Sequence, residues 1–318
     1  MATLQPETRT GGRPEGHPTE VREAYGRALA GSSVRDRYAG AAGRIHVLEK
    51  GTGPPLVLLH GTGLNAAFFL PLLEALDGVR AIAPDRPGQG LSDPVDLAPR
   101  RYFEAAIAWL DDLLDALELP VTVLLGHSAG GLWALRYALA RPERIERLVL
   151  IGPPALPKTR CPLPYRLIAT PGVGELLPWL VPPSPASVLQ FAGFMGEKDT
   201  LSNHPQLVDL IVAAGRDPIA ASVDSAEARV LVSPFALVSP RGFRHRSRVR
   251  RDELRRLRVP TLLIWGEREP LGGVSVAREV VESIPEARLE VLPGGHVPWL
   301  GHPAATAAAV LGFIGRRD

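Results

Sequence analysis

The chain has 318 residues, 45% of them hydrophobic, and a formal net charge of +2. This length and composition allow a sizeable core in one large domain or in one domain with an insertion, and the near-neutral charge gives no indication of a nucleic-acid partner. The single cysteine, Cys161, excludes an intramolecular disulfide. Paired Cys or His residues at metal-binding spacing, a secretory signal and an apolar run of membrane-spanning length are absent from the sequence. We therefore expect a cytoplasmic protein without stable membrane insertion.

Residues 1–20 are polar and rich in Gly, Pro and Thr, a composition that predicts a disordered tail. Residues 21–152 open with a short helix in VREAYGRALA and then alternate apolar strands with helices. The expected strands are RIHVLEKG, GPPLVLLHG, VRAIAPD, VTVLLGH and RIERLVLIG, and the expected helices are AAFFLPLLEALDG, YFEAAIAWLDDLLDALELP and AGGLWALRYALARP. Strands that alternate with helices predict a parallel sheet whose strands are joined by helical crossovers.

Residues 153–245 break this alternation. They contain many prolines and two apolar segments, YRLIATPGVGELLPWLV and ASVLQFAGFMG, and we interpret them as an inserted, largely helical cap. Residues 246–318 resume the strand and helix pattern with PTLLIWGE, VAREVVESIP, ARLEVLPG and PAATAAAVLGFIGRR. The chain therefore divides into a tail, a first core part, a cap and a second core part.

The stretch GHSAG, residues 126–130, lies where VTVLL ends and the next expected helix begins. A serine between glycines on a strand-to-helix turn is typical of a nucleophile elbow, whose strained backbone projects the hydroxyl above the sheet edge. The glycines remove Cβ atoms that would clash where strand and helix cross, and the helix directs its positive end at the hydroxyl oxygen. A simple tight turn is the alternative, but the surrounding strand and helix favour Ser128 as a nucleophile.

A serine hydroxyl is a poor nucleophile at neutral pH and needs a base. His296 directly follows the last predicted strand, in LEVLPGGHVPWLGHP, and catalytic groups gather at the carboxyl ends of parallel strands. We therefore predict that His296 is the base. Two other histidines have simpler explanations: His302 precedes Pro303 at the start of the final helix, and His60 is expected to be buried and hydrogen-bonded.

The base needs a carboxylate that orients it, and LLIWGEREPLG offers Glu267 and Glu269 at the end of a strand. A pocket for the oxyanion is expected in LLHGTGLN, a glycine-rich loop after the strand beside the elbow. We predict that the backbone N–H groups of Thr62 and Ala129 are its two donors. An ordinary loop with Asn65 near a helix cap is compatible with that role.

Two other groups of charged residues invite a functional interpretation. Asp85 and Arg86 follow a strand in PDRPGQGLSDP, where an aspartate usually braces the loop. The arginines between residues 241 and 258 have no aromatic partners for base stacking beyond Phe243, and acids lie among them in RRDELRRLR. We expect a loop brace in the first case and a solvated helix in the second, without a nucleic-acid partner.

With these stretches the chain resembles the α/β-hydrolase superfamily, in particular its serine-nucleophile, esterase-like bacterial members with an inserted lid. The matching segments are GPPLVLLHGTG, AIAPDRPGQGLSDP, LLGHSAGG, PTLLIWGEREPLG and LPGGHVPWLGHP. The resemblance implies an α/β fold with an eight-stranded, mostly parallel sheet flanked by helices, and neither a metal nor an organic cofactor. It also implies the chain order nucleophile, acid, base. The family usually has aspartate where this chain has Glu269, and its alternative acid position here holds Pro153 and Pro154, so Glu269 is the predicted acid.

A serine nucleophile favours acyl chemistry through an acyl-enzyme that water then hydrolyses. The first hypothesis is hydrolysis of a carboxylic ester or lactone of a hydrophobic small molecule, because the cap is rich in apolar side chains. Hydrolysis of a carbon–carbon bond, or a lyase or cyclase reaction on a natural-product intermediate, is the second hypothesis. The third is a non-catalytic ligand-binding protein on the same fold. The oligomeric state stays open.

Overall fold

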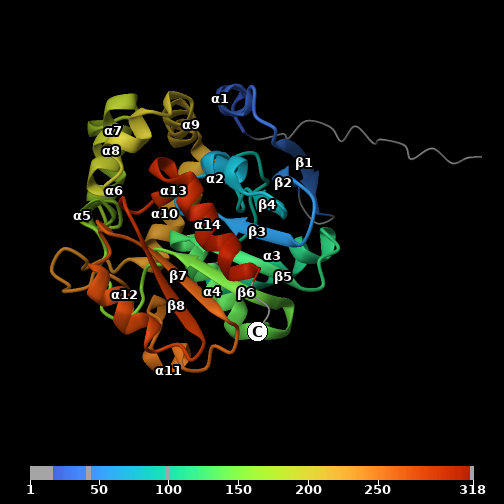
Figure 1. The fold of residues 1–318 in the computed structure, drawn as a ribbon. Coiled ribbons are helices and arrows are strands. Elements are labelled where there is room, and N and C mark those ends of the chain that lie inside the picture. Colours follow the sequence, from blue (N-terminus) through green and yellow to red (C-terminus); the bar gives the residue numbers. More distant parts are fainter. Residues whose placement is uncertain (1–16, 41–43, 98–99, 316–318) are drawn as a thin grey trace, which may run out of the picture.

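An eight-stranded sheet forms the centre of the molecule (Figure 1). The structure is a computed structural model that describes residues 17–40, 44–97 and 100–315. Within these ranges the strands are β1 (Arg35–Ala39), β2 (Ile45–Lys50), β3 (Pro55–Leu59), β4 (Arg80–Pro84), β5 (Thr122–His127), β6 (Ile145–Ile151), β7 (Thr261–Gly266) and β8 (Ala287–Leu292).

The sheet order is β1-β2-β4-β3-β5-β6-β7-β8. Strand β2 is antiparallel to β1 and β4, and the remaining neighbours are parallel. The predicted fold class is thus confirmed, including the place of β3 beside β5. The strand pattern in the sequence did not reveal β1, because its RDRYA sequence is charged. Charged side chains are common on edge strands, where they discourage pairing with other chains.

Two layers of helices cover the sheet, and successive strand residues point to opposite layers. In β3, for example, Val57 and Leu59 contact the layer of α3, α4 and α12, whereas Leu56 and Leu58 contact the layer of α1, α2, α13 and α14. The helices are α1 (Thr19–Leu29), α2 (Leu70–Ala75), α3 (Tyr102–Ala116), α4 (Ser128–Ala140), α11 (Arg251–Leu254), α12 (Val274–Val281), α13 (Pro298–Gly301) and α14 (Pro303–Ile314), with short 3₁₀ turns η1 (Ala66–Phe69), η2 (Pro142–Arg144) and η3 (His245–Ser247). This double cover explains why the central strands are continuous apolar runs.

Six helices lie between β6 and η3, in the stretch that the sequence assigns to the cap. They are α5 (Leu163–Ile168), α6 (Val173–Leu180), α7 (Pro185–Phe194), α8 (Lys198–Ser202), α9 (Pro205–Arg216) and α10 (Pro218–Leu231). Helices α7, α8 and α9, yellow in Figure 1, lie together at one end of the molecule, and α9 packs against α1. No helix in the described part of the chain combines the length and apolar character needed to cross a membrane.

The start of the described chain differs from the predicted tail. Residues 1–16 lie outside the described residues, but His17 packs against the body of the protein and α1 begins at Thr19. His17 is buried and contacts two segments, Asp217 with Nδ1 at 2.5 Å and the Ser92 carbonyl with Nε2 at 2.9 Å. The polar composition of residues 17–20 predicted disorder, but buried polar partners compensate the cost of ordering this segment.

Candidate active site

Ser128 occupies the turn between β5 and α4. Its φ of +52° is left-handed, a region that a residue with a Cβ seldom adopts. The close crossing of strand and helix explains the flanking glycines, because a Cβ on Gly126 would lie 2.5 Å from the Gly130 carbonyl oxygen. A Cβ on Gly130 would lie 2.4 Å from the His60 carbonyl oxygen. Strain of this kind costs on the order of 1–3 kcal/mol and persists where the surrounding structure enforces it.

His296 and Glu269 form a buried pair in the loops after β8 and β7. The Nδ1 atom of His296 lies 2.8 Å and 2.9 Å from the two carboxylate oxygens of Glu269, and it donates a hydrogen bond to them. A further donor, the backbone N–H of Leu271, holds Glu269 Oε1 at 3.2 Å. With Nδ1 protonated, Nε2 of a neutral His296 carries a lone pair and can accept a proton.

Ser128 and His296 line one cavity of about 570 Å³ beneath the cap helices. Among the described residues no hydrogen bond joins the Ser128 hydroxyl to His296. Catalytic hydrogen bonds are commonly long without substrate and tighten in the complex. The arrangement brings a hydroxyl and an imidazole to one cavity wall, with a carboxylate behind the imidazole.

The two predicted oxyanion donors lie beside Ser128. Thr62 and Ala129 line a recess of about 40 Å³ together with Ser128 and His296. Gly61, which precedes Thr62, packs so closely on the elbow that a Cβ there would lie 2.9 Å from the Ser128 Cβ. The structure therefore brings together all five predicted site residues, the fifth being Glu269 behind His296.

Residues of the cap hold the loop of His296. Glu197, between α7 and α8, accepts hydrogen bonds through Oε1 from the backbone N–H groups of Gly295 at 2.8 Å and Val297 at 2.9 Å. The N–H of His296 itself donates to the Met195 carbonyl at 3.0 Å. Burial raises the pKa of Glu197, although these hydrogen bonds act in the opposite direction. Three consecutive backbone donors of the loop are thus bound by one turn of the cap.

His127, at the end of β5, contacts the same loop from the sheet. Its Nε2 donates to the His296 carbonyl at 3.1 Å, and its ring lies 4.7 Å from the imidazole of His296. Burial, and then the proximity of His296, lowers the pKa of His127 well below its usual range, so this imidazole is neutral. Its Nδ1 has no hydrogen-bond partner among the described residues. His127 therefore acts as a neutral donor that positions the His296 backbone.

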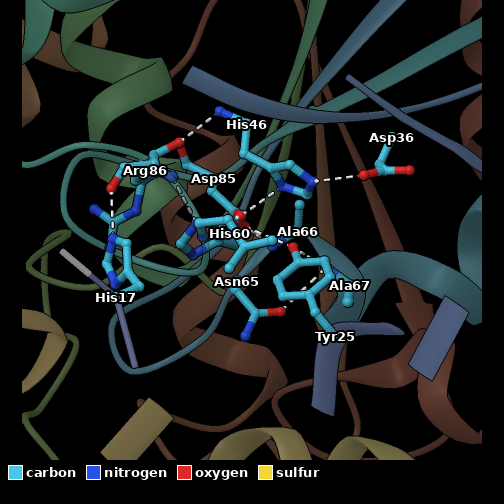
Figure 2. A network of polar contacts seen from close by, with 12 residues as sticks. His17, Tyr25, Asp36, His46, His60, Asn65, Ala66, Ala67, Asp85 and Arg86 are labelled. Atoms are coloured by element: carbon cyan, nitrogen blue, oxygen red, sulfur yellow. Dashed lines mark hydrogen bonds and ion pairs between the residues drawn. The ribbon is translucent and has the colours of Figure 1, made fainter. Parts of the chain in front are cut away.

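Asp85 is the centre of a separate network, which Figure 2 shows from close by. Its carboxylate accepts hydrogen bonds from His46 Nδ1 at 2.8 Å, the Tyr25 hydroxyl at 2.8 Å and the Ala66 N–H at 2.7 Å. A fourth donor is the N–H of Leu91, at 2.9 Å. Burial opposes ionisation, but His46 outweighs it, so the pKa of Asp85 is lowered. Asp85 braces its loop, as the sequence predicts.

Arg86 makes a contact that the sequence did not predict. Its guanidinium binds both carboxylate oxygens of Glu227 in α10, at 2.7 Å and 3.0 Å, and all of these groups are buried. Burial raises the pKa of Glu227, but Arg86 more than offsets this effect and the pKa is lowered overall. Glu227 also accepts from the Thr62 hydroxyl at 2.5 Å and from the Tyr102 hydroxyl. The loop of the candidate oxyanion donor is therefore bound to the cap.

The sequence offered two neighbouring glutamates for the acid, and two histidines besides His296 needed another explanation. Glu267 is exposed and Glu269 is buried against His296, so geometry distinguishes them. His302 is exposed and is the N-cap residue of α14, as predicted. His60 is buried, accepts from the Arg86 N–H at 2.9 Å and donates to the Gly61 carbonyl, also as predicted.

The contacts of Glu197 and Glu227 differ in how far the sequence could have indicated them. Nothing local to Glu197 indicates that it binds the loop of His296, about a hundred residues later in the chain (98 and 100 residues for its two bonds). Glu227 lies three residues after Asp224 in PIAASVDSAEARVL, so the two acids share one face of the helix. That spacing could have indicated a helix face directed at polar partners.

The comparisons with known proteins identify the family and agree with the fold. A family model described as the alpha/beta hydrolase fold matches residues 54–303. The chain is 28% identical over 289 residues to a 2-hydroxy-6-oxo-6-phenylhexa-2,4-dienoate hydrolase of Burkholderia cepacia, covering 85% of this chain and 91% of that protein. It is 29% identical over 273 residues to a pimeloyl-[acyl-carrier protein] methyl ester esterase of Shewanella sp. (strain MR-7), covering 81% and 90%. The crystal structure of carboxylesterase CesB from Bacillus subtilis superimposes with a TM-score of 0.65 at 25% identity, covering 93% and 98%.

Proposed function

The chain belongs to the α/β-hydrolase family, and on that premise we propose that Ser128, His296 and Glu269 form the catalytic triad of an enzyme that hydrolyses esters or lactones of hydrophobic small molecules. The observation that carries this proposal is the buried hydrogen bond between Glu269 and His296 Nδ1 beside the cavity that contains Ser128. A base held in this tautomer presents Nε2 to the nucleophile.

The proposed reaction begins when the Ser128 hydroxyl attacks the ester carbonyl carbon and its proton passes to His296 Nε2. The negative charge that forms on the carbonyl oxygen accepts hydrogen bonds from the N–H groups of Thr62 and Ala129. Collapse breaks the bond to the alcohol, which takes the proton from His296 and leaves an acyl-enzyme. Water then attacks the acyl group with His296 as base, releasing the acid and restoring Ser128.

The shape and lining of the cavity support a hydrophobic substrate. Apolar side chains from the core and from the cap face it, among them Phe68, Ile168, Phe191 and Ile211. Sites for small molecules are commonly apolar with a few polar groups that fix orientation. The ester esterase and the carboxylesterase among the similar proteins support the ester as the bond that is cleaved.

A second candidate reaction is hydrolysis of a carbon–carbon bond in a hydroxylated oxo-dienoate. The observation in its favour is the similarity to the Burkholderia cepacia hydrolase, whose named substrate is a ketone and contains no ester. Both reactions use the same site residues in our proposal, so product analysis with each substrate class distinguishes them. Reaction of Ser128 with a fluorophosphonate probe tests directly whether this serine is the nucleophile.

The direct test is hydrolysis of p-nitrophenyl esters of increasing acyl length by the full chain, with the Ser128→Ala variant as control. We expect kcat/KM to rise from acetate to medium chains, because each buried CH₂ contributes up to about 0.8 kcal/mol. Ser128→Ala should lose turnover while its thermal unfolding stays close to that of the wild type. Near-full activity in this variant on any substrate of the wild-type enzyme would overturn the proposed mechanism.

A further inference from the structure

Asp224 brings a carboxylate into the wall of the largely apolar cavity. It lies on α10 of the cap, on the same helix face as Glu227, and lines the cavity that also contains Ser128. The mechanism proposed above gives this group no role. A carboxylate in apolar surroundings is unfavourable unless hydrogen bonds or charges compensate it, so its partners are informative.

One oxygen of Asp224 is fully engaged by the core. Its Oδ1 accepts hydrogen bonds from the backbone N–H of Gly63 at 3.0 Å and from Gln89 Nε2 at 2.5 Å. The other oxygen, Oδ2, receives no hydrogen bond from any residue that the structure describes. Asp224 therefore has one fixed oxygen and one acceptor available at the cavity.

Among the residues that the structure describes, no cationic side chain forms an ion pair with Asp224. Arg86 is paired with Glu227, one helical turn away, and that pair is electrically balanced. Burial, followed by the repulsion of Glu227, raises the pKa of Asp224 to about 6. At neutral pH the group is thus predominantly ionised, and it is poorly solvated.

Asp224 also lies near the bond that would be cleaved. Gly63, whose N–H binds it, follows the proposed oxyanion donor Thr62, and consecutive Cα atoms are about 3.8 Å apart. Glu227 ties α10 to the Thr62 hydroxyl and to Arg86, and the bonds of Asp224 to Gly63 and Gln89 fix its carboxylate on the same loop. Its free oxygen is therefore held beside the loop of the proposed oxyanion donor.

We propose that Asp224 Oδ2 accepts a hydrogen bond from a hydroxyl or protonated amino group of the substrate, so that the enzyme selects hydrophobic esters that carry such a donor near the reacting carbonyl. This inference rests on the proposed esterase function and names its substrate class. A site that hydrogen-bonds a substrate donor discriminates against the analogue without it, because that analogue covers the carboxylate without satisfying it. The apolar remainder of the substrate fills the rest of the cavity.

The test compares matched esters that differ in one group. On the acyl side these are p-nitrophenyl hexanoate and its 3-hydroxy, 3-amino and 3-trimethylammonio derivatives, and on the alcohol side hexanoate esters of butanol and of its 3-hydroxy and 3-amino analogues. We expect a donor on one of the two sides to raise kcat/KM by about 10–100-fold, the range for a hydrogen bond to a charged group. The trimethylammonio ester carries charge without an N–H donor, so its kcat/KM relative to plain hexanoate measures the effect of charge alone. The hydroxy and amino esters distinguish the two sources of the donor.

Asp224→Asn is the informative variant. Its carbonyl oxygen can keep the bonds to Gly63 and Gln89, while an NH₂ group replaces the free acceptor. We expect the ratio of kcat/KM for donor-bearing esters to kcat/KM for plain hexanoate, measured within this variant, to fall to about one. Asp209→Asn, the same change at an exposed position of α9, is the control and should keep the wild-type preference.

An equal donor preference in wild type and Asp224→Asn, or no preference of the wild type on either side, would overturn the inference. Absence of ester hydrolysis would overturn the proposed function instead. The inference would then be decided by calorimetric binding of the corresponding amides to the Ser128→Ala protein, in which the hydroxy or amino amide should bind about 10–100-fold more tightly than the plain one. Equal affinities in that measurement would overturn it as well.

Discussion

Two buried histidines in this protein each bind a carboxylate at 2.8 Å, yet their surroundings differ. The pair of His46 and Asp85 is enclosed, with both side chains fully buried and Nε2 of His46 facing Asp36 at 3.6 Å. The pair of His296 and Glu269 lies at a cavity wall beside Ser128. The same two chemical groups are thus enclosed in one place and lie beside a cavity in the other, where our proposal assigns them proton transfer. The difference lies in what the second ring nitrogen can reach.

The numbers of hydrogen bonds that Asp85 and Glu269 accept also distinguish the two pairs. Asp85 accepts three hydrogen bonds besides that of His46, from Tyr25, Ala66 and Leu91. Glu269 accepts one besides that of His296. A carboxylate whose lone pairs are all occupied joins three segments of chain, whereas Glu269 mainly holds one imidazole. Removing a member of each pair should therefore affect stability in the first case and activity in the second.

The largest effect on activity is expected for His296→Ala. Without a base for the Ser128 hydroxyl, kcat should fall on the order of 10⁴-fold or more, with a thermal unfolding midpoint close to that of the wild type. Ester turnover and circular dichroism melting measure the two quantities. His302→Ala is the matched control and should be mild. A greater loss of kcat in His302→Ala than in His296→Ala would refute the assignment of the base.

Glu269→Gln should follow, with a loss of kcat of up to about 10⁴-fold, because the amide can stabilise the wrong tautomer and cannot balance the imidazolium. Glu269→Asp should be intermediate, since the charge stays but its reach is shorter by one methylene. Glu267→Gln, at the exposed neighbouring acid, is the control and should be mild. Comparable losses in Glu267→Gln and Glu269→Gln would mean that the hydrogen bond to His296 does not set the rate.

Asp85→Asn should break the other pair. Removing one partner of a buried ion pair costs about 3–5 kcal/mol of the free energy of unfolding, because the remaining charge is uncompensated. Urea denaturation measures this loss, and kcat of the folded fraction should change little at a temperature where the variant is native. A large loss of kcat with unchanged stability would show that the network of Figure 2 contributes to the chemistry.

The smallest effect is expected in the pH dependence of stability. Burial opposes the charge on His46, but Asp36 and Asp85 outweigh it and raise the pKa of His46 to about 9. A histidine in the unfolded chain has a pKa of about 6.5, so this stabilisation is complete below that pH and is lost as the pH rises through about 9. The difference in thermal midpoint between wild type and His46→Gln should therefore shrink from pH 6 to pH 10. A constant difference would contradict a charged His46.

The part of the fold that the sequence predicts is the part with strong local patterns. Strands covered on both faces are continuous apolar runs, and the elbow has its glycines, so their positions follow from neighbouring residues alone. The edge strand β1 lacks such a run, and residues 17–20 carry no sign that His17 will be buried against Asp217. These features depend on contacts with residues that are distant in the sequence.

In the candidate site, too, some residues are indicated by local sequence and others only by long-range contacts. Ser128 and His296 were predicted from their places next to strand ends, and Glu269 was preferred to Glu267 through the family resemblance. The structure adds that Glu269 is buried against His296 whereas Glu267 is exposed. The contacts of Glu197 and Glu227 with the core span 98 or more residues. A long-range contact of a single side chain leaves no periodicity, so only the folded arrangement reveals it.

The turn that carries Met195 and Glu197 has a consequence for protein engineering. Chimeras that exchange the cap would ordinarily be cut at the ends of β6 and β7, on the view that cap and core are separate modules. Here such a graft would also replace the acceptors of three backbone N–H groups that flank and include His296. A recombined enzyme would keep its active site in register only if the donated cap brought an equivalent carbonyl and carboxylate, so the inherited unit is the cap together with residues 294–297.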